Sequence, residues 1–580
     1  MIEARAAKKP KPPNARQLMN EWNLKVYAAV ICAVIAVFIL YHWIRSINRK
    51  LTSSPKAWQR LPGVFIVVKT SRQIRSLLIR KVPGFPSGGH ALLAIAFVGV
   101  NIVMCFHHVD RAKTSNFAAR FGWMSTANMA LCVFFGLKNT PLGILSGHSY
   151  ERLNHFHRLA GYAAVLQLVL HAIFYMIYYG NQNRWSTLLE DQNWEGIAAG
   201  VAMIMLLLGM ARNLGYEAFY ISHLLGFLLA IIFTALHRPY WIWKIPVAML
   251  FAGAIWALDR LIRGSRMLYN MVNNSATIYQ LPDNGARMVI KKPLAGAVPG
   301  SHCFVWIPSI RAFQTHPFTI VSNTKAGGLE LILNSYSGFT KAVHDRAHRE
   351  IGTSVWASVD GPYGAIPDPK NFDKVILIAG GTGATFTFGL ATSLIQRLES
   401  NSGTHVDFIW AARKRENLDW FADHIQSLCQ HGAGMNMMLH VTREGSKESL
   451  TDSPAPTPLE HSVLAPQQTV NKGADSLSSE DPMPGATETV EEKTAANVSA
   501  KSAEKHRRSQ DLDSLCDIKY DKLEAAKVIG ETLEAIEPGQ RVLIASCGPQ
   551  SLTDLVRTTA AQHIASAEIS IEVHCETFGW

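Results

Sequence analysis

The chain has 580 residues, room for about three or four domains, and 48% of them are hydrophobic while only 17% are charged. This balance is too apolar for an ordinary soluble enzyme. The net charge of +12 requires no nucleic-acid partner, because many Lys and Arg residues flank apolar runs, as they do beside a membrane. The eight cysteines show no CxxC pairing that would indicate a zinc site or a disulfide framework.

Up to about residue 265, apolar runs alternate with short polar connectors. Each run is close to the about 20 residues that cross the hydrocarbon of a bilayer. The predicted spans are residues 24–46, 90–109, 118–137, 155–179, 195–213, 216–237 and 245–263. After a tail of residues 1–23, we therefore expect residues 24–265 to form an all-α bundle of seven transmembrane helices.

Charge placement predicts the orientation of this bundle. Ten Lys and Arg residues lie between positions 45 and 81, and such loops stay in the cytosol. The last span ends in three arginines, so the following half is expected in the cytosol too. The basic N-terminal tail disagrees, because an odd number of spans places it outside, and we follow the larger bias. No cleavable signal peptide is visible. The plasma membrane is the expected location, and an internal membrane fits the same topology.

Two predicted spans carry histidines at the same spacing. His157 and His171 are fourteen residues apart, and so are His223 and His237. In a helix, this spacing is a rise of about 21 Å and a return to within about 40° of the same face. Both helices run from cytoplasm to exterior, so His157 is level with His223, and His171 with His237.

Paired imidazoles are good axial ligands of haem iron, and polar groups inside a membrane need partners. The four histidines therefore predict two six-coordinate b-type haems stacked across the membrane. The alternative is that they are interfacial histidines, hydrogen-bonded to neighbouring helices. His155 is a rival of His157, but its separation of sixteen from His171 turns it to another side. Arg158 is a candidate partner for a haem propionate.

The second half reads as soluble sequence. Short β-branched or aromatic runs such as 275–281, 286–292 and 302–308 are separated by Gly, Pro and Asn turns, which predicts a small antiparallel barrel over residues 266–368. From residue 375, "VILIAGGTGATFTFGLATSLI" reads as a buried strand, a glycine turn and a helix. Such a turn binds nucleotide phosphates, although these glycines alone could form any tight turn.

Further strands at 405–413, 435–442 and 541–549 predict a doubly wound, Rossmann-like sheet within residues 369–580, whose last strand ends at Cys547. Residues 445–512 are rich in Ser, Thr, Pro, Glu and Ala and almost free of aromatics. Such a tract cannot bury enough apolar surface to fold, so it is predicted to be a disordered insertion. A passive spacer is favoured over a phosphorylated segment.

In this combination the chain resembles the fungal ferric reductases, which belong with the NADPH oxidases to a superfamily of transmembrane haem and flavin reductases. The resemblance rests on the four histidines, on "HPFT", "GPYG", "GGTG" and "SCGP", and on the final "FGW". It covers nearly the whole chain apart from the tail and the insertion. It implies a two-haem membrane core joined to an FAD-binding barrel and an NADPH-binding domain.

The resemblance also implies residue roles. FAD would be bound by His316, Pro317, Phe318 and Thr319, and by Gly338 and Thr340 near its pyrophosphate. The turn that contains Gly361 and Gly364 is similar to the turn beside the dinucleotide phosphates. NADPH phosphates would lie against Gly380, Gly381, Thr382 and Gly383, and its nicotinamide beside Cys547, Gly548 and Pro549. Trp580 resembles the terminal aromatic that stacks on flavin until nicotinamide displaces it. Taken singly, each motif could be ordinary turn or core packing, and Cys547 a buried core thiol.

A preference for NADPH over NADH calls for a basic residue after the second strand. "WAARKREN" offers Arg413, Lys414 and Arg415, of which Arg413 is the chosen candidate. The Gly-Arg-Pro contact of the family is missing from "CDIKYDKLEAAKVIGETL", which leaves the adenosine contacts open.

The activity implied is NADPH-dependent reduction of an extracellular ferric or cupric chelate, with electrons passing from cytosolic NADPH through FAD and two haems b. Reduction would support iron or copper uptake, for which a metal importer would be a partner. A superoxide-generating NADPH oxidase with O₂ as acceptor is one alternative, and a non-enzymatic membrane protein with a degenerate reductase domain is another. The additional N-terminal span and the equal histidine spacings favour the ferric reductases.

Overall fold

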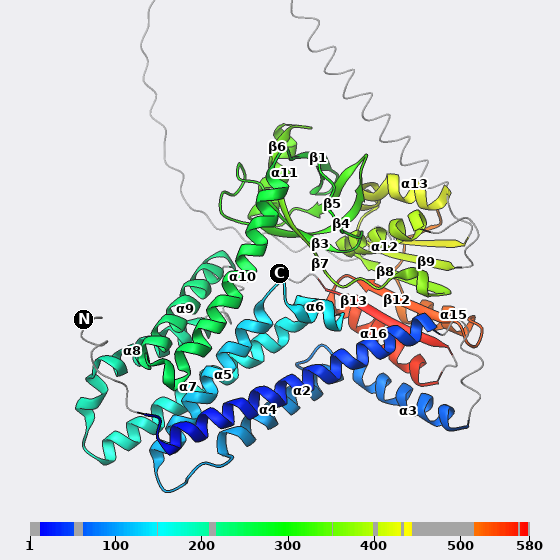
Figure 1. Ribbon diagram of the computed structural model, residues 1–580. Coiled ribbons are helices and arrows are strands. Elements are labelled where there is room, and N and C mark those ends of the chain that lie inside the picture. The colour runs from blue at the N-terminus through cyan, green and yellow to red at the C-terminus, as the bar shows by residue number, and fades with distance from the viewer. Residues whose placement is uncertain are drawn as a thin grey trace, which may run out of the picture.

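The computed structural model describes residues 12–51, 62–147, 149–207, 216–350, 352–397, 404–430, 434–443, 516–566 and 569–577. A bundle of long helices lies at one end of the molecule and two β-sheets lie at the other (Figure 1). The last helix of the bundle, α10 (Ile245–Met271), extends beyond the bundle and runs directly into the first sheet.

Each of the seven predicted spans contains a helix among its described residues. These helices are α2 (Ala15–Leu51), α4 (Gly88–Phe106), α5 (Thr114–Gly136), α7 (Tyr150–Asn181), α8 (Asp191–Leu206), α9 (Tyr216–His237) and α10. Among the described helices, five are both long and apolar enough to cross a membrane, namely Ala15–Ile44, Gly88–Phe106, Tyr150–Asn181, Ala218–His237 and Ile245–Met271. Of the other two, α5 carries several polar side chains, and the described part of α8 has only 16 residues.

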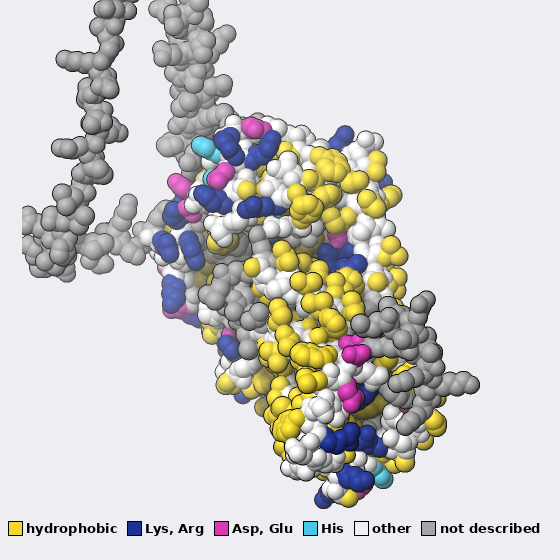
Figure 2. Space-filling model, turned by 90° about the vertical axis from the view of Figure 1, so that its left-hand side faces the viewer, with side chains coloured by type: hydrophobic (Ala, Val, Ile, Leu, Met, Phe, Trp, Pro, Cys, Tyr) yellow, Lys and Arg dark blue, Asp and Glu magenta, His cyan; other side chains and the backbone are white. Residues whose placement is uncertain are grey.

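The surface of the bundle is apolar where a bilayer would surround it. Hydrophobic side chains cover much of the helical part in Figure 2, and Lys and Arg gather towards its lower end. Large apolar residues are exposed on α4, α7, α9 and α10, among them Ile95, Leu166, Ile221 and Leu250. Such continuous exposure is expected of lipid-facing helices and not of a soluble domain.

Inside the bundle, one buried polar network joins four helices. Asn128 of α5 accepts a hydrogen bond from the Tyr27 hydroxyl of α2 at 2.6 Å. Its amide donates to Asn101 of α4 at 2.6 Å and to Gln167 of α7 at 2.8 Å. Because lipid supplies no hydrogen-bond partners, polar side chains must satisfy one another across helices. This explains why α5 tolerates polar residues, since it lies against other helices.

The first sheet is antiparallel, as predicted for the FAD-binding barrel. Its order is β6-β1-β2-β5-β4-β3-β7, and α11 (Phe339–Arg349) packs against it. Alternating residues such as Met288, Ile290, Val305 and Leu331 are fully buried in its core. The strands are β1 (Ser275–Leu281), β2 (Gly285–Ile290), β3 (His302–Trp306), β4 (His316–Thr324), β5 (Gly328–Asn334), β6 (Ser354–Trp356) and β7 (Ser358–Tyr363).

The second sheet is parallel, with the order β11-β10-β9-β8-β12-β13. The first strand, β8, is central, and separate apolar cores lie on the two faces, as in a doubly wound fold. The strands are β8 (Lys374–Gly380), β9 (His405–Ala412), β10 (Met435–Val441), β11 (Ile518–Lys519), β12 (Arg541–Cys547) and β13 (Ser570–Glu576). The helices are α12 (Ala384–Arg397), α13 (Ala422–Gln430), α15 (Ala525–Glu534) and α16 (Gln550–Ser566).

One prediction about this sheet is wrong. Cys547 does end β12, but β12 is not the last strand, because β13 pairs with it in parallel along its whole length. The stretch "SIEVHCE" alternates apolar and polar residues, which is a weak strand signal next to the continuous apolar runs of β8 and β12. The predicted insertion at 445–512 and the terminal Trp580 lie outside the described residues.

The basic segment after the first span lies on the side of the nucleotide domain. Helix α3 (Pro62–Ile79) packs against α16. Lys81 forms an ion pair with Asp554, and the Arg557 guanidinium donates to the Pro86 carbonyl at 2.9 Å. The two segments that charge placement assigned to one side of the membrane are therefore in contact.

Candidate functional site

The four histidines of the bundle form two facing pairs. The ring centroids of His157 and His223 are 6.2 Å apart, and those of His171 and His237 are 6.3 Å apart. Helices α7 and α9 thus present two imidazoles to each other at two depths. This is the pairing that the sequence spacing predicted.

In three of the four histidines, the ring nitrogen Nδ1 faces a backbone carbonyl. Nδ1 of His157 lies 2.9 Å from the Cys132 carbonyl oxygen. The Nδ1 atoms of His171 and His237 lie 2.8 Å and 2.6 Å from the carbonyls of Ala118 and Gln192. A carbonyl can only accept, so each Nδ1 carries the proton and each Nε2 keeps its lone pair for a metal. Nδ1 of His223 is buried and has no hydrogen-bond partner among the described residues.

These distances fit haem iron. A metal–imidazole bond is about 2 Å long and the nitrogen is about 1 Å from its ring centre, so two axial ligands have centroids about 6 Å apart. Both pairs match this separation. Direct hydrogen bonding between the rings would need a closer approach. The donor atoms, their tautomers and their spacing all suit a metal between the rings.

Glycines on neighbouring helices make room for three of these rings. A Cβ atom on Gly122 of α5 would lie 2.6 Å from Nδ1 of His171. On Gly136, also in α5, it would lie 2.9 Å from Nδ1 of His157. Since the two glycines are fourteen residues apart, α5 repeats the spacing of the histidines it contacts. Gly196 of α8 lies equally close to His237, at 2.6 Å.

His155 and Arg158 bind each other. The Arg158 guanidinium donates to Nδ1 of His155 at 2.6 Å, and the His155 ring packs edge-on against His90. His155 is therefore turned away from the facing pairs, as its spacing predicted. Arg158 is exposed and occupied by this contact, which does not favour its predicted role with a haem propionate.

Two of the predicted FAD motifs meet where the inner strand β4 of the first sheet begins. His316, the first residue of β4, stacks on Phe339 at 4.3 Å, and Phe318 packs on the same ring at 6.0 Å. Gly338, at φ 60°, precedes the first turn of α11, and Thr340 accepts a hydrogen bond from the Tyr336 backbone. A helix N-terminus approached by glycine is suited to phosphate. The motif residues Pro317 and Thr319 lie on the same strand.

The predicted NADPH motifs also come together. The turn Gly380–Gly383 follows β8, and Cys547, Gly548 and Pro549 follow the adjacent strand β12. A Cβ on Gly380 would lie 2.8 Å from the Pro549 ring, and one on Gly383 would overlap the Cys547 carbonyl. Only glycine permits this approach, and the site lies at the carboxyl ends of the strands, where α/β sheets bind ligands. Thr382 occupies the same turn.

Of the three basic residues after β9, Arg413 is exposed and makes no ion pair among the described residues. Lys414 is paired with Asp283 at 2.5 Å, and Arg415 with Asp419 at 3.3 Å. Of the three, Arg413 is therefore the residue best placed to bind the extra phosphate that distinguishes NADPH from NADH. The turn that holds Gly361 and Gly364 lies beside the first sheet's β3, with Gly364 at φ 103°.

Sequence reasoning missed the acidic neighbour of Cys547. Glu576 of β13 lies directly opposite Cys547. Burial raises the pKa of the Cys547 thiol well above its usual value, and the Glu576 charge raises it further. Burial also opposes ionisation of Glu576, but the hydrogen bond and charge of His574 and the charge of Arg152 lower its pKa to about 2. Cys547 is thus a neutral thiol beside a carboxylate.

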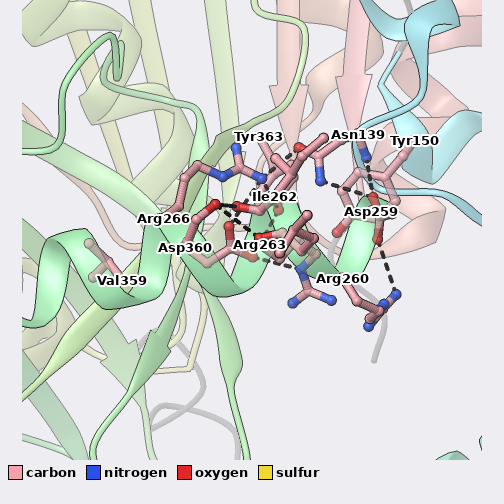
Figure 3. Close-up of polar contacts among 12 residues, drawn as sticks. Asn139, Tyr150, Asp259, Arg260, Ile262, Arg263, Arg266, Val359, Asp360 and Tyr363 are labelled. Carbon is pink, nitrogen blue, oxygen red and sulfur yellow. Dashed lines mark hydrogen bonds and ion pairs between the residues drawn. The ribbon is translucent and has the colours of Figure 1, made fainter. Parts of the chain in front are cut away.

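A buried ionic junction joins the bundle to the first sheet (Figure 3). Asp360 of β7 is fully buried, and it pairs with Arg263 at 2.7 Å and Arg266 at 3.1 Å, both from α10. The Tyr363 hydroxyl also donates to Asp360 at 2.8 Å. Arg266 reaches Asn139, in the loop after α5, at 2.5 Å. The junction fixes the membrane helices against the strand that leads into the "GPYG" turn.

Comparison with known protein families agrees with this order of domains. A model described as the ferric reductase like transmembrane component matches residues 121–234. An FAD-binding domain matches residues 269–367, and the ferric reductase NAD binding domain matches residues 372–561. Together they indicate a multi-pass membrane protein with an FAD-binding domain and an NAD-binding domain. The chain is thus similar, domain by domain, to the ferric reductases.

Curated relatives are fungal. Ferric/cupric reductase transmembrane component 2 of Schizosaccharomyces pombe is 28% identical over 383 residues, covering 56% of this chain and 66% of the relative. Ferric reductase transmembrane component 3 of Saccharomyces cerevisiae is 29% identical, covering 58% and 47%. Component 6 of the same yeast is 23% identical, covering 93% and 73%. The chain thus spans about half to two thirds of the first relatives.

Proposed function

We propose that the chain is an NADPH-dependent metalloreductase that moves electrons from the cytosol across a membrane to an extracellular ferric or cupric chelate. The observation that carries the proposal is the two facing histidine pairs at two depths, 6.2 Å and 6.3 Å between ring centroids. Their spacing supports two haem irons, one near each leaflet. The matched FAD- and NAD-binding domains supply an entry point for electrons.

Each part of the chain has a defined task in this proposal. When bound, FAD would accept a two-electron hydride and release single electrons, and haem iron would carry one electron at a time. His157 and His223 would hold the inner iron, and His171 and His237 would hold the outer one. Backbone carbonyls at Nδ1 orient three of these rings, and the glycines of α5 and α8 leave room for the same three.

On the cytosolic side, the chain would bind two ligands, FAD and NADPH. The site where FAD would bind, near the N-terminus of α11, is lined by His316, Phe318 and Thr340. The glycine turn after β8 and the Cys547 turn after β12 would together form the surface that binds NADPH. The neutral Cys547 thiol would position the nicotinamide, and Trp580 would cover the flavin in the absence of nucleotide.

The proposed topology places the N-terminus outside and both sheets in the cytosol of a plasma-membrane protein. The basic segment of residues 62–81, which contacts the nucleotide domain, supports a common cytosolic side for both. We propose a division into residues 24–265 for the haem domain, 266–368 for the FAD domain and 369–580 for the NADPH domain. Reduction outside would loosen chelation and release the metal to an importer.

The test is a count of haems. We expect the pyridine haemochrome of the purified protein to give two b haems per chain, and His223→Ala to reduce this to one or none. A wild-type protein without a b-type Soret and α-band spectrum would contradict the proposal. Ferric-chelate reduction by intact cells then identifies the acceptor. Loss of the signal on adding superoxide dismutase would assign the protein to the superoxide-forming oxidases instead.

A further inference from the structure

A cation without an anionic partner lies where the bundle meets the FAD-binding sheet. Lys138 belongs to the short loop between α5 and α6 (Pro141–Ser146) and is largely removed from solvent. Its ammonium nitrogen lies 3.2 Å from the centroid of the Phe304 ring and 5.7 Å from that of Tyr150. Among the described residues, no carboxylate lies within ion-pair distance of it.

The neighbouring carboxylates are already bound. Asp360 is shared by Arg263 and Arg266, as Figure 3 shows. Asp259 accepts two hydrogen bonds from Asn139, at 2.8 Å and 2.9 Å, and lies 3.3 Å from Arg260. The nearby Glu151 is paired with His302 at 2.8 Å. Among the described residues, the junction thus holds three carboxylates, Asp259, Asp360 and Glu151, beside four cations, Lys138, Arg260, Arg263 and Arg266, an excess of one positive charge.

A buried ammonium needs a compensating anion. Here burial, and then repulsion by Arg263 and Arg260, lower the pKa of Lys138 well below its usual value. An anionic oxygen at the junction would offset both effects. Phe304 contributes a cation–π contact, which stabilises the ammonium but does not neutralise it.

The position of Lys138 points to the source of such an anion. Lys138 follows Gly136, which contacts the inner histidine His157, by two residues. On its other side, Phe304 of β3 lies opposite Pro317 of the predicted flavin motif. Lys138 therefore stands between the expected inner haem and the expected FAD. Arg158, the partner that the sequence suggested for a propionate, is occupied by His155.

We propose that Lys138 anchors an anion-binding site at this junction, and that its ligand is an anionic oxygen group of a resident cofactor, either a propionate of the inner haem or a phosphate of FAD. The inference rests on the proposed function, because that function supplies both cofactors. Lys138 is a positioning residue in this scheme. It holds a cofactor at the boundary that electrons must cross and sets the local charge there.

The experiment compares Lys138→Met, Lys138→Arg and the matched control Lys69→Met, which removes an exposed lysine of α3. Haem and FAD contents of the wild type are measured first, and their absence would reject the proposed function itself. Spectroelectrochemical titration then gives the midpoint potential of each haem. Flavin fluorescence gives the dissociation constant of FAD. Lys138→Arg and Lys69→Met should match the wild type in both measurements.

The two sources of the anion give different results. If Lys138 holds a propionate, Lys138→Met lowers the midpoint potential of one haem, because a lost cation disfavours the added electron, and leaves FAD affinity unchanged. If Lys138 holds a phosphate, FAD affinity falls by roughly tenfold, the value of a charge-assisted hydrogen bond, and both haem potentials stay unchanged.

Wild-type values of both quantities in Lys138→Met would overturn the inference. Should that variant not accumulate, Lys138→Gln, which keeps a polar head, provides the same comparison. If neither neutral variant accumulates, Lys138→Arg tests whether the site needs a positive charge. A normal Lys138→Arg protein shows that the site needs a positive charge, and failure of this variant as well shows that the charge is not what the site uses.

Discussion

Single backbone positions decide whether the histidines of the bundle can face each other. A histidine pair is chemically sufficient for haem iron, but the rings must be held edge-on to the space between α7 and α9. Carbonyls at positions 118, 132 and 192 orient three of them. Glycines at positions 122, 136 and 196 let the neighbouring helices approach. The sequence displays these glycines, but it does not show that they touch histidines.

The first prediction concerns Gly122. Gly122→Val should displace His171, because even the first side-chain atom would lie 2.6 Å from its ring. We expect the haem content to fall from two per chain to one, with FAD content unchanged, as measured by pyridine haemochrome and flavin absorbance. Gly99→Val is the control, because nothing lies within 4 Å of a Cβ there. Two haems in Gly122→Val would show that His171 does not hold one.

The second prediction concerns nucleotide choice. Arg413→Ala should raise the KM for NADPH by roughly tenfold or more, the value of a charge-assisted hydrogen bond, and leave the KM for NADH unchanged. Steady-state kinetics with both nucleotides measures this. Lys414→Ala serves for comparison, since Lys414 is already paired with Asp283. Equal losses with NADPH and NADH would mean that Arg413 does not bind the extra phosphate.

At the scale of elements, the contact between α10 and β7 couples the two halves. Besides the Asp360 pairs, the Ser358 hydroxyl donates to the Met267 carbonyl at 2.6 Å, and Asn270 donates to the Val359 carbonyl at 2.9 Å. These contacts recur every three or four residues along one face of α10, the period of a helix. The flavin sheet is therefore held against a membrane helix along a continuous line.

The third prediction tests this contact. Asp360→Asn leaves the buried Arg263 and the half-buried Arg266 without a carboxylate, which costs about 3–5 kcal/mol. Stopped-flow measurements should show normal reduction of flavin by NADPH and slowed reduction of haem, together with a lower Tm. In the control Asp345→Asn, an exposed pair with Lys341 is lost, worth at most about 1 kcal/mol. Unchanged haem reduction in Asp360→Asn would show that the junction is not needed for coupling.

Elements with a strong period were predictable, and those stabilised by their surroundings were less so. The continuous apolar runs of β8, β9 and β12 and the seven apolar helices could be read directly. Strand β13 was missed, because its alternating residues gain strand structure only by pairing with β12. Among the described helices, α5 is long enough for a span but is not one of the five that are apolar enough. It tolerates Asn128 because its polar partners lie on other helices.

At the scale of the molecule, residues 445–512 connect two adjacent strands of the nucleotide domain. Strands β10 and β11, on either side of this segment, pair in parallel, with Leu439 opposite Ile518 and His440 opposite Lys519. The Sγ atoms of Cys429 and Cys516 are 3.1 Å apart beside this pair. The described part of the sheet is therefore closed by direct pairing of these two strands.

The fourth prediction follows from this closure. Replacing residues 445–512 by a short Gly/Ser linker should leave NADPH-dependent flavin reduction and the Tm close to those of the full chain. The measurement is diaphorase activity together with thermal unfolding. A large loss of either would show that the insertion contributes contacts to the nucleotide domain.

The sequence by itself determined the class of the protein, the order of its domains and the residue types at each proposed site. Local periodicity and short motifs carry that information, because a helix face, a glycine turn or a buried strand is defined within a few residues. Only the tertiary structure decided which atoms meet. The facing rings, the glycines against them, Glu576 beside Cys547, and Lys138 among cations all join segments far apart in the chain. Their energetics depend on burial and distance, which no local pattern records.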